Sequence, residues 1–229
     1  MNRRFALLAL AAFALSATAA DAARPRARVA KPRPAPVAPV PLPDTVRVAM
    51  VTALGTIELD LDHKHAPITV ENFVHYVDAK KFDGIPFYRS MRLDWGTQPN
   101  GLIQAGLQAN PLKVFKPIAH EPTTLTGISH KAGTISMARY APGTAMADFS
   151  ILLSDLTGLD ADPKSPNPDI QAGFAAFGHV VSGMDVVKKI WDSPLSPTKG
   201  EGPLKGQMLE PPVKVLTVRR VAVPTAPQQ

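Results

Sequence analysis

Phe87-Tyr88-Arg89, Gly101-Leu102-Ile103-Gln104-Ala105-Gly106 and Gly133-Thr134-Ile135-Ser136-Met137-Ala138-Arg139 are the segments that decide the fold of this chain. Each is a short apolar run interrupted by a polar residue, a pattern typical of strands in a small barrel or sandwich. Two later segments belong to the same pattern, Asp148-Phe149-Ser150-Ile151-Leu152 and Gly173-Phe174-Ala175-Ala176-Phe177-Gly178-His179-Val180. The order and separation of the five segments therefore carry the fold assignment.

The residues before this region predict a hairpin and a helix. Val46–Val51 and Thr56–Leu61 alternate in part, and the short turn Ala53-Leu54-Gly55 separates them, which indicates a β-hairpin. Pro67 then opens a segment whose apolar residues recur at helical spacing. The residues predicted to share the buried face of this helix are Val70, Phe73, Val74 and Val77.

The C-terminal part of the region adds one more helix and one more strand. Met184–Trp191 has an apolar side at helical spacing, and Val213–Val221 reads as a closing strand. Many short strands with only two helices, and no alternation of strands with helices, favour a closed antiparallel barrel.

The five segments together resemble the cyclophilin-type peptidyl-prolyl cis-trans isomerases, and the resemblance extends from about Thr45 to Arg220. It implies a mainly β fold: a closed eight-stranded antiparallel barrel capped by two helices. It also implies isomerase activity on X-Pro bonds, with proline-containing unfolded or partly folded proteins as the partners.

Isomerisation makes modest chemical demands. Rotation about an X-Pro bond meets a barrier of roughly 18 to 20 kcal/mol, because the amide C–N bond has partial double-bond character. Twisting leaves a lone pair on the prolyl nitrogen, so a hydrogen-bond donor aimed at that nitrogen and an apolar pocket for the ring favour the twisted state. Turnover in about a millisecond needs roughly 6 to 7 kcal/mol of such preference. The reaction requires no nucleophile, metal or organic cofactor, and we expect none.

The resemblance assigns roles to specific residues. Arg89 stands at the position of the catalytic arginine, and Gln104 at that of the glutamine which holds the arginine and contacts the substrate backbone. A guanidinium suits the task because it stays charged and presents a planar fork of donors. Ala138 and Arg139 match the pair whose main-chain groups bind the residues before proline. The predicted substrate-binding residues are Phe87, Leu102, Ala138, Arg139, Asp148, Ser150, Ile170 and Phe174.

The chain departs from the family pattern around the predicted pocket. Gly101 and Ser150 stand where pocket phenylalanines are usual, and Asp148 replaces a glutamine that contacts substrate. Asp148 could pair with Arg89 and hold it, or draw the guanidinium away from the prolyl nitrogen. The insertion Leu93–Asn100 carries Trp95, which either folds back to supply aromatic surface or remains exposed.

The ends of the chain predict export. Residues 1–22 have the form of a cleavable signal peptide: Arg3-Arg4, an apolar run over Phe5–Leu15, then small residues. Residues 23–43 form a Pro-rich linker expected to be disordered, residues 44–222 the cyclophilin-like domain and residues 223–229 a disordered tail. We therefore expect a periplasmic location.

Charge and composition restrict the partners. The formal charge of +6 lies entirely in residues 1–43, which hold seven Lys or Arg and one acid, whereas the remainder holds 18 bases and 18 acids. A neutral domain gives no support for nucleic-acid binding. The apolar run near the N-terminus is too short for a membrane span. We expect a monomer, and the absence of cysteine excludes disulfides.

Other functions have weaker support. His63, His65 and His75 could suggest a metal site, but no cysteine accompanies them. Ser136 and Ser150 lie in strand patterns without the sharp turn of a hydrolase nucleophile. The main alternative is a non-catalytic module or chaperone on the same barrel that binds proline segments, because two pocket aromatics are missing. A structural envelope protein tethered by residues 23–43 is a third possibility.

Overall fold

The computed structural model describes residues 41–223. The predicted signal peptide, nearly all of the predicted linker and residues 224–229 lie outside the described residues. Eight strands close into a barrel in the order β1-β2-β7-β5-β6-β4-β3-β8, and each neighbouring pair is antiparallel. The strands are β1 Thr45–Thr52, β2 Gly55–Asp62, β3 Pro86–Arg92, β4 Gly101–Ala105, β5 Thr134–Met137, β6 Phe149–Leu152, β7 Ala176–Ser182 and β8 Met208–Arg220. The predicted eight-stranded antiparallel barrel is confirmed.

The predicted hairpin is formed by β1 and β2, which pair along their whole length from Thr45↔Asp62 to Thr52↔Gly55. Alternate residues of both strands are buried, as expected for a sheet with one face on the core. Gly55 ends the turn with φ +136°, and a Cβ there would lie 2.7 Å from a methyl group of Val186. This glycine thus lets the helix that contains Val186 approach the hairpin closely.

Aromatic side chains pack against one another in the buried core. Phe73 lies 5.4 Å from both Phe149 and Phe177, measured between ring centroids, and 4.8 Å from Phe82. These four side chains are almost completely buried. Such ring pairs stabilise the folded state beyond the contribution of buried apolar area. The core therefore joins α1 to strands β6 and β7.

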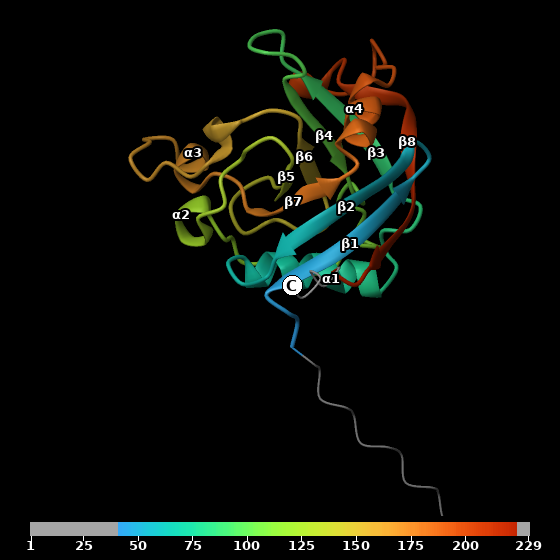
Figure 1. Cartoon of the computed structure of the whole chain (residues 1–229). Coiled ribbons are helices and arrows are strands. Elements are labelled where there is room, and N and C mark those ends of the chain that lie inside the picture. The colour runs from blue at the N-terminus through green and yellow to red at the C-terminus, as the bar shows by residue number, and fades with distance from the viewer. Residues whose placement is uncertain (1–40, 224–229) are drawn as a thin grey trace, which may run out of the picture. The chain divides into compact units, whose positions relative to one another are not determined.

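Two longer helices, α1 Pro67–Asp78 and α4 Met184–Asp192, lie on different sides of the barrel (Figure 1). The predicted apolar face of α1 is buried. Its first turn has no side-chain cap of its own. Instead the buried Glu121 accepts hydrogen bonds from the main-chain N–H groups of Ile68 and Thr69 at 3.1 and 2.7 Å. A carboxylate at this end satisfies donors that the helix leaves free.

The structure also differs from the predicted elements in some places. It contains two short helices that were not predicted, α2 Thr123–Thr126 and α3 Pro168–Ala172. Strand β8 begins at Met208, five residues before the predicted start, because Pro211 and Pro212 interrupt the alternation that the prediction relied on. Among residues 41–223, no helix is long and apolar enough to cross a membrane.

Candidate active site

Arg89 on β3 and Gln104 on β4 lie directly opposite each other in the ladder that joins the two strands. Nη1 of Arg89 donates a 2.9 Å hydrogen bond to Oε1 of Gln104. The register between β3 and β4 therefore brings together the two residues that were predicted to act together. Cross-strand partners on one face of a sheet are within reach of each other.

Gln207, the residue immediately before β8, holds the same guanidinium through a different nitrogen. Nε of Arg89 donates a 2.8 Å hydrogen bond to Oε1 of Gln207. This contact was not predicted from the sequence, because 118 positions separate Gln207 from Arg89. A prediction would have required the register between β3 and β8, which the Pro-containing start of β8 conceals.

The guanidinium of Arg89 is partly desolvated. Burial lowers the pKa of Arg89 from its ordinary value, although an arginine stays charged at physiological pH. Its two acceptors are neutral amide oxygens, and no carboxylate among residues 41–223 forms an ion pair with it. Nη2 has no hydrogen-bond partner in the described part of the chain. Positive charge and free donors thus remain available to a ligand.

A small hollow of about 260 Å³ opens beside Arg89. This volume is below the roughly 300 to 1,000 Å³ of sites for drug-sized ligands, so it suits one ring or side chain. Apolar side chains form most of its wall, and two hydroxyl groups, those of Ser136 and Ser150, lie among them. The apolar lining residues are Met91, Leu102, Met137, Ala138, Leu152, Leu159 and Phe174.

A second hollow of about 360 Å³ adjoins the first. Four residues line both hollows: Arg89, Gln104, Ala138 and Arg139. The wall of the second hollow also contains Tyr88, Tyr140, Met146, Asp148, Leu204 and Met208. An arginine with free donors thus lies between a smaller, largely apolar hollow and a larger one.

Comparison with known proteins accords with this geometry. The family model "Cyclophilin type peptidyl-prolyl cis-trans isomerase/CLD" matches residues 47–220. The chain belongs to the cyclophilin family. It is 34% identical to a peptidyl-prolyl cis-trans isomerase of Acinetobacter baylyi over 183 residues, which are 78% of this chain and 87% of the relative. It is 36% identical to such an enzyme of Streptomyces antibioticus over 144 residues, covering 62% of this chain and 81% of the relative.

Solved structures agree on the fold. A cyclophilin type peptidyl-prolyl cis-trans isomerase of Cryptosporidium parvum superposes with a TM-score of 0.60 at 16% identity, covering 79% of this chain and 99% of that one. The fold assigned from the sequence is confirmed, and this cyclophilin is a peptidyl-prolyl cis-trans isomerase. Proline-containing polypeptides are what such enzymes act on.

Asp148 does neither of the two things that its sequence position suggested. Its carboxylate accepts hydrogen bonds from the hydroxyl of Tyr88 and from the main-chain N–H groups of Gln108 and Ala109, at 2.9, 3.0 and 3.4 Å. Gln108 and Ala109 both have φ of +52°, and successive N–H groups in such turns form a concave anion site. In this cyclophilin the side chain of Asp148 occupies that site, so it anchors a loop at the edge of the larger hollow.

Arg139 turns its side chain into the protein, where it is only 2% exposed. The guanidinium lies 4.6 Å from the ring centroid of Phe174 and donates to the carbonyl oxygen of Gly173 at 2.7 Å. It also donates to the carboxylate of Asp169 at 3.1 Å. The side chain therefore fixes Phe174 in the wall of the smaller hollow.

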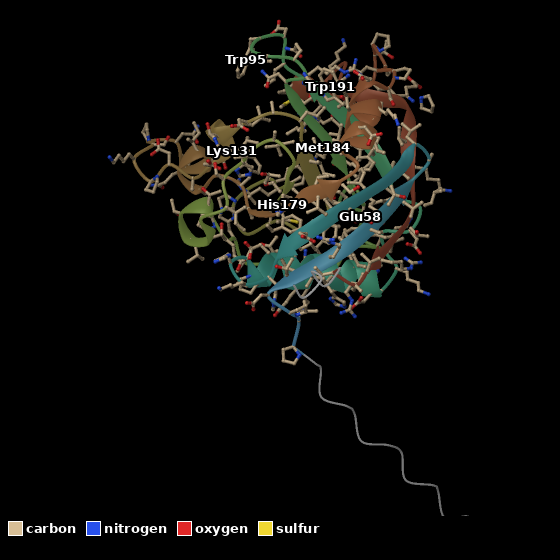
Figure 2. All side chains as sticks on the ribbon, viewed as in Figure 1. Glu58, Trp95, Lys131, His179, Met184 and Trp191 are labelled. Atoms are coloured by element: carbon tan, nitrogen blue, oxygen red, sulfur yellow. The ribbon has the colours of Figure 1, made fainter. Side chains whose placement is uncertain are left out.

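Two residues that were predicted to bind substrate do not line the hollows beside Arg89. Phe87 is completely buried and packs edge-on against Phe149, 6.2 Å away, so it belongs to the core and does not face the hollows. Ile170 on α3 is 46% exposed and lines neither of the two hollows beside Arg89. Trp95 is 62% exposed at the tip of its loop, whereas Trp191 is buried on α4 (Figure 2). The tryptophan that could have folded back over the site remains outside it.

The missing aromatic at residue 101 has a steric cause. Gly101 has φ +147°, and a Cβ there would lie 2.0 Å from the carbonyl oxygen of Met91. The insertion Leu93–Asn100 brings the two strand ends this close, since Leu93 N–H bonds to the carbonyl of Asn100 at 2.9 Å. The side chain of Met91, which lines the smaller hollow, supplies apolar surface in this cyclophilin.

Ser136 on the wall of the smaller hollow belongs to a hydrogen-bond chain that the sequence did not predict. Its hydroxyl lies 2.8 Å from Nε2 of the fully buried His130, and Nδ1 of His130 lies 2.6 Å from Asp160. Burial lowers the pKa of His130 despite the carboxylate beside it. A neutral ring that donates from Nδ1 to Asp160 accepts from Ser136 at Nε2, so the chain fixes the Ser136 hydroxyl.

Proposed function

We propose that this isomerase lowers the barrier to rotation through Arg89. The observation that supports this most directly is the guanidinium itself: it is partly desolvated, held by Gln104 and Gln207, and left with Nη2 free beside an apolar hollow. A donor fixed in advance costs little reorganisation when the lone pair appears on the prolyl nitrogen. The twisted amide gains this hydrogen bond and the planar isomers do not, which is the difference that accelerates rotation.

In this proposal the prolyl ring enters the smaller hollow. Leu102, Leu152 and Leu159 offer it apolar surface. The residues that precede proline then extend toward the larger hollow, past the residues that line both hollows: Arg89, Gln104, Ala138 and Arg139. Catalysis follows because one side of the bond is gripped while the other keeps room to rotate.

A different hollow, of about 650 Å³, lies between Lys81–Pro86 and Gly106–Lys113. It lacks Arg89 and Gln104, so it offers no donor that fits the reaction. NMR contacts between an X-Pro peptide and the protein distinguish the two places. We expect prolyl ring protons to contact the methyl groups of Leu102 and Leu152. Contacts with Ile85 and Leu112 instead would contradict the assignment.

We further propose that the substrates are proteins that fold in the cell envelope. The support is the sequence of residues 1–22 together with the Pro-rich residues 23–43, which resemble an export signal and a tether. N-terminal sequencing of the protein from a periplasmic fraction tests this, and we expect the mature chain to begin between Ala20 and Ala23. Protein that stays in the cytoplasm with Phe5–Leu15 intact would reject it.

A further inference from the structure

Gln207 makes a contact with Arg89 that ordinary strand pairing does not require. Strand β8 lies beside β3 (Figure 1), and Met208 is the residue paired with Arg89 in the ladder. The side chain of Gln207, next to it, accepts from Nε of Arg89 at 2.8 Å. We propose that Gln207 is a positioning residue for isomerisation: it fixes the plane of the Arg89 guanidinium. The inference rests on the proposed role of Arg89.

Gln207 is itself held at several points. Its side-chain Nε2 donates to the carbonyl oxygen of Pro203 at 2.9 Å. Its main-chain carbonyl oxygen accepts a hydrogen bond from the N–H of Ser90 at 2.9 Å. Its main-chain N–H donates to the carbonyl oxygen of Leu204 at 3.1 Å. Both ends of the amide side chain are therefore occupied, which leaves it little freedom to leave Arg89.

Two acceptors restrain the orientation of the guanidinium more than one acceptor does. With Gln104 alone, the guanidinium could pivot about its bonded Nη1 and turn Nη2 away from the prolyl nitrogen. A second acceptor at Nε, on another edge of the planar group, prevents that rotation. Small displacements of a catalytic group reduce rate steeply, so this restraint acts on kcat more than on substrate affinity.

The chemical type of the second acceptor also matters. A carboxylate at this position would hold Arg89 more strongly but would offset its charge. The amide oxygen of Gln207 restrains the guanidinium and leaves its positive charge for the substrate. This division fits a residue that orients Arg89 rather than one that neutralises it.

The test compares Gln207→Met, which has similar length and no amide oxygen, with Gln207→Glu, which keeps an acceptor oxygen. Lys205→Ala is the control, because Lys205 is exposed on the same segment and lines neither hollow beside Arg89. Exchange NMR on an X-Pro peptide gives kcat and KM, and the ¹⁵N–¹H signal of Arg89 Nε reports its hydrogen bond. The Arg89→Ala variant is measured alongside.

For Gln207→Met we expect kcat to fall about tenfold, KM to change less than twofold, and the Arg89 Nε signal to shift and exchange faster with water. Gln207→Glu should restore the slow exchange of that signal and part of kcat. Lys205→Ala should have the kcat and the Arg89 Nε signal of the unsubstituted protein.

Wild-type kcat in Gln207→Met, or a loss of kcat with an unmoved Arg89 Nε signal, would overturn the positioning role. If either result came with an inactive Arg89→Ala, the arginine mechanism would stand and only Gln207 would lose its role. An active Arg89→Ala would instead reject the proposed mechanism itself.

Discussion

The hydroxyl of Tyr88 donates a 2.9 Å hydrogen bond to Oδ1 of Asp148, and both side chains line the larger hollow. Desolvation raises the pKa of Tyr88, and the nearby Asp148 carboxylate adds to that effect. Burial likewise raises the pKa of Asp148, although its three hydrogen bonds oppose the change. The pair is therefore a partly buried carboxylate held by a neutral phenol, and Arg89 keeps only its two amide acceptors.

This arrangement predicts the pH dependence of an Asp148→Asn variant. The folded protein binds the Asp148 proton more tightly than the unfolded chain, so ionisation of Asp148 costs folding free energy. The cost is absent below the ordinary aspartate pKa of about 3.9 and complete above the raised pKa of the folded state. Asparagine does not ionise, so the variant should gain stability relative to the wild type as pH rises through this range. Urea titrations between pH 3 and 7 measure the difference in unfolding free energy between the variant and the wild type. A decrease of the variant's relative stability with rising pH would contradict the burial effect.

Gly101 should not tolerate a side chain. Gly101→Ala places a Cβ against the Met91 carbonyl oxygen and forces alanine into φ +147°. We expect a loss of about 2 to 4 kcal/mol in the free energy of unfolding, measured by denaturant titration. Gly158→Ala is the matched control, because no heavy atom lies within 4 Å of a Cβ built there and its φ is not in the positive region. Equal stability of the two variants would show that the strand ends can separate.

Ser150 should control how tightly the smaller hollow holds a prolyl ring. Ser150 lines that hollow, opposite Gln104 on one side and Ser136 on the other. Ser150→Phe should fill part of it and strengthen binding of an X-Pro peptide by up to about 1 to 2 kcal/mol, seen as a lower KM. Ser150→Ala removes the hydroxyl without filling the hollow and should leave KM nearly unchanged. An unaltered KM in Ser150→Phe would mean that the ring binds elsewhere.

The sequence predicted those parts of the fold in which one local pattern dominates. Alternation over β1 and β2 and the apolar face of α1 were sufficient for both elements. Arg89 and Gln104 could be predicted as partners because the resemblance covers both strands that carry them. Phe87 was assigned to the substrate surface from the resemblance, but both ladders of β3 shift register between Phe87 and Arg89, and the side chain of Phe87 lies in the core.

The remaining features depend on contacts between distant segments. Gln207 reaches Arg89 only because β8 starts early, through two prolines that hide its pattern. Asp148 accepts hydrogen bonds from a loop in which Gln108 and Ala109 have positive φ values. No local sequence pattern predicted that loop conformation. The role of a titratable side chain here is decided by which donors the closed barrel brings to it. Residue type alone suggested a contact with Arg89 that does not form.

The central claim is that Arg89 carries isomerisation, and kcat/KM of Arg89→Ala tests it most directly. Exchange NMR on an X-Pro peptide gives this value, with Arg220→Ala as the control because Arg220 pairs with Asp78 at the surface, outside both hollows. We expect Arg89→Ala to lose at least about a hundredfold in kcat/KM, the scale for removing one electrostatic donor, while its circular dichroism spectrum stays unchanged. Wild-type kcat/KM in a folded Arg89→Ala protein would contradict the claim.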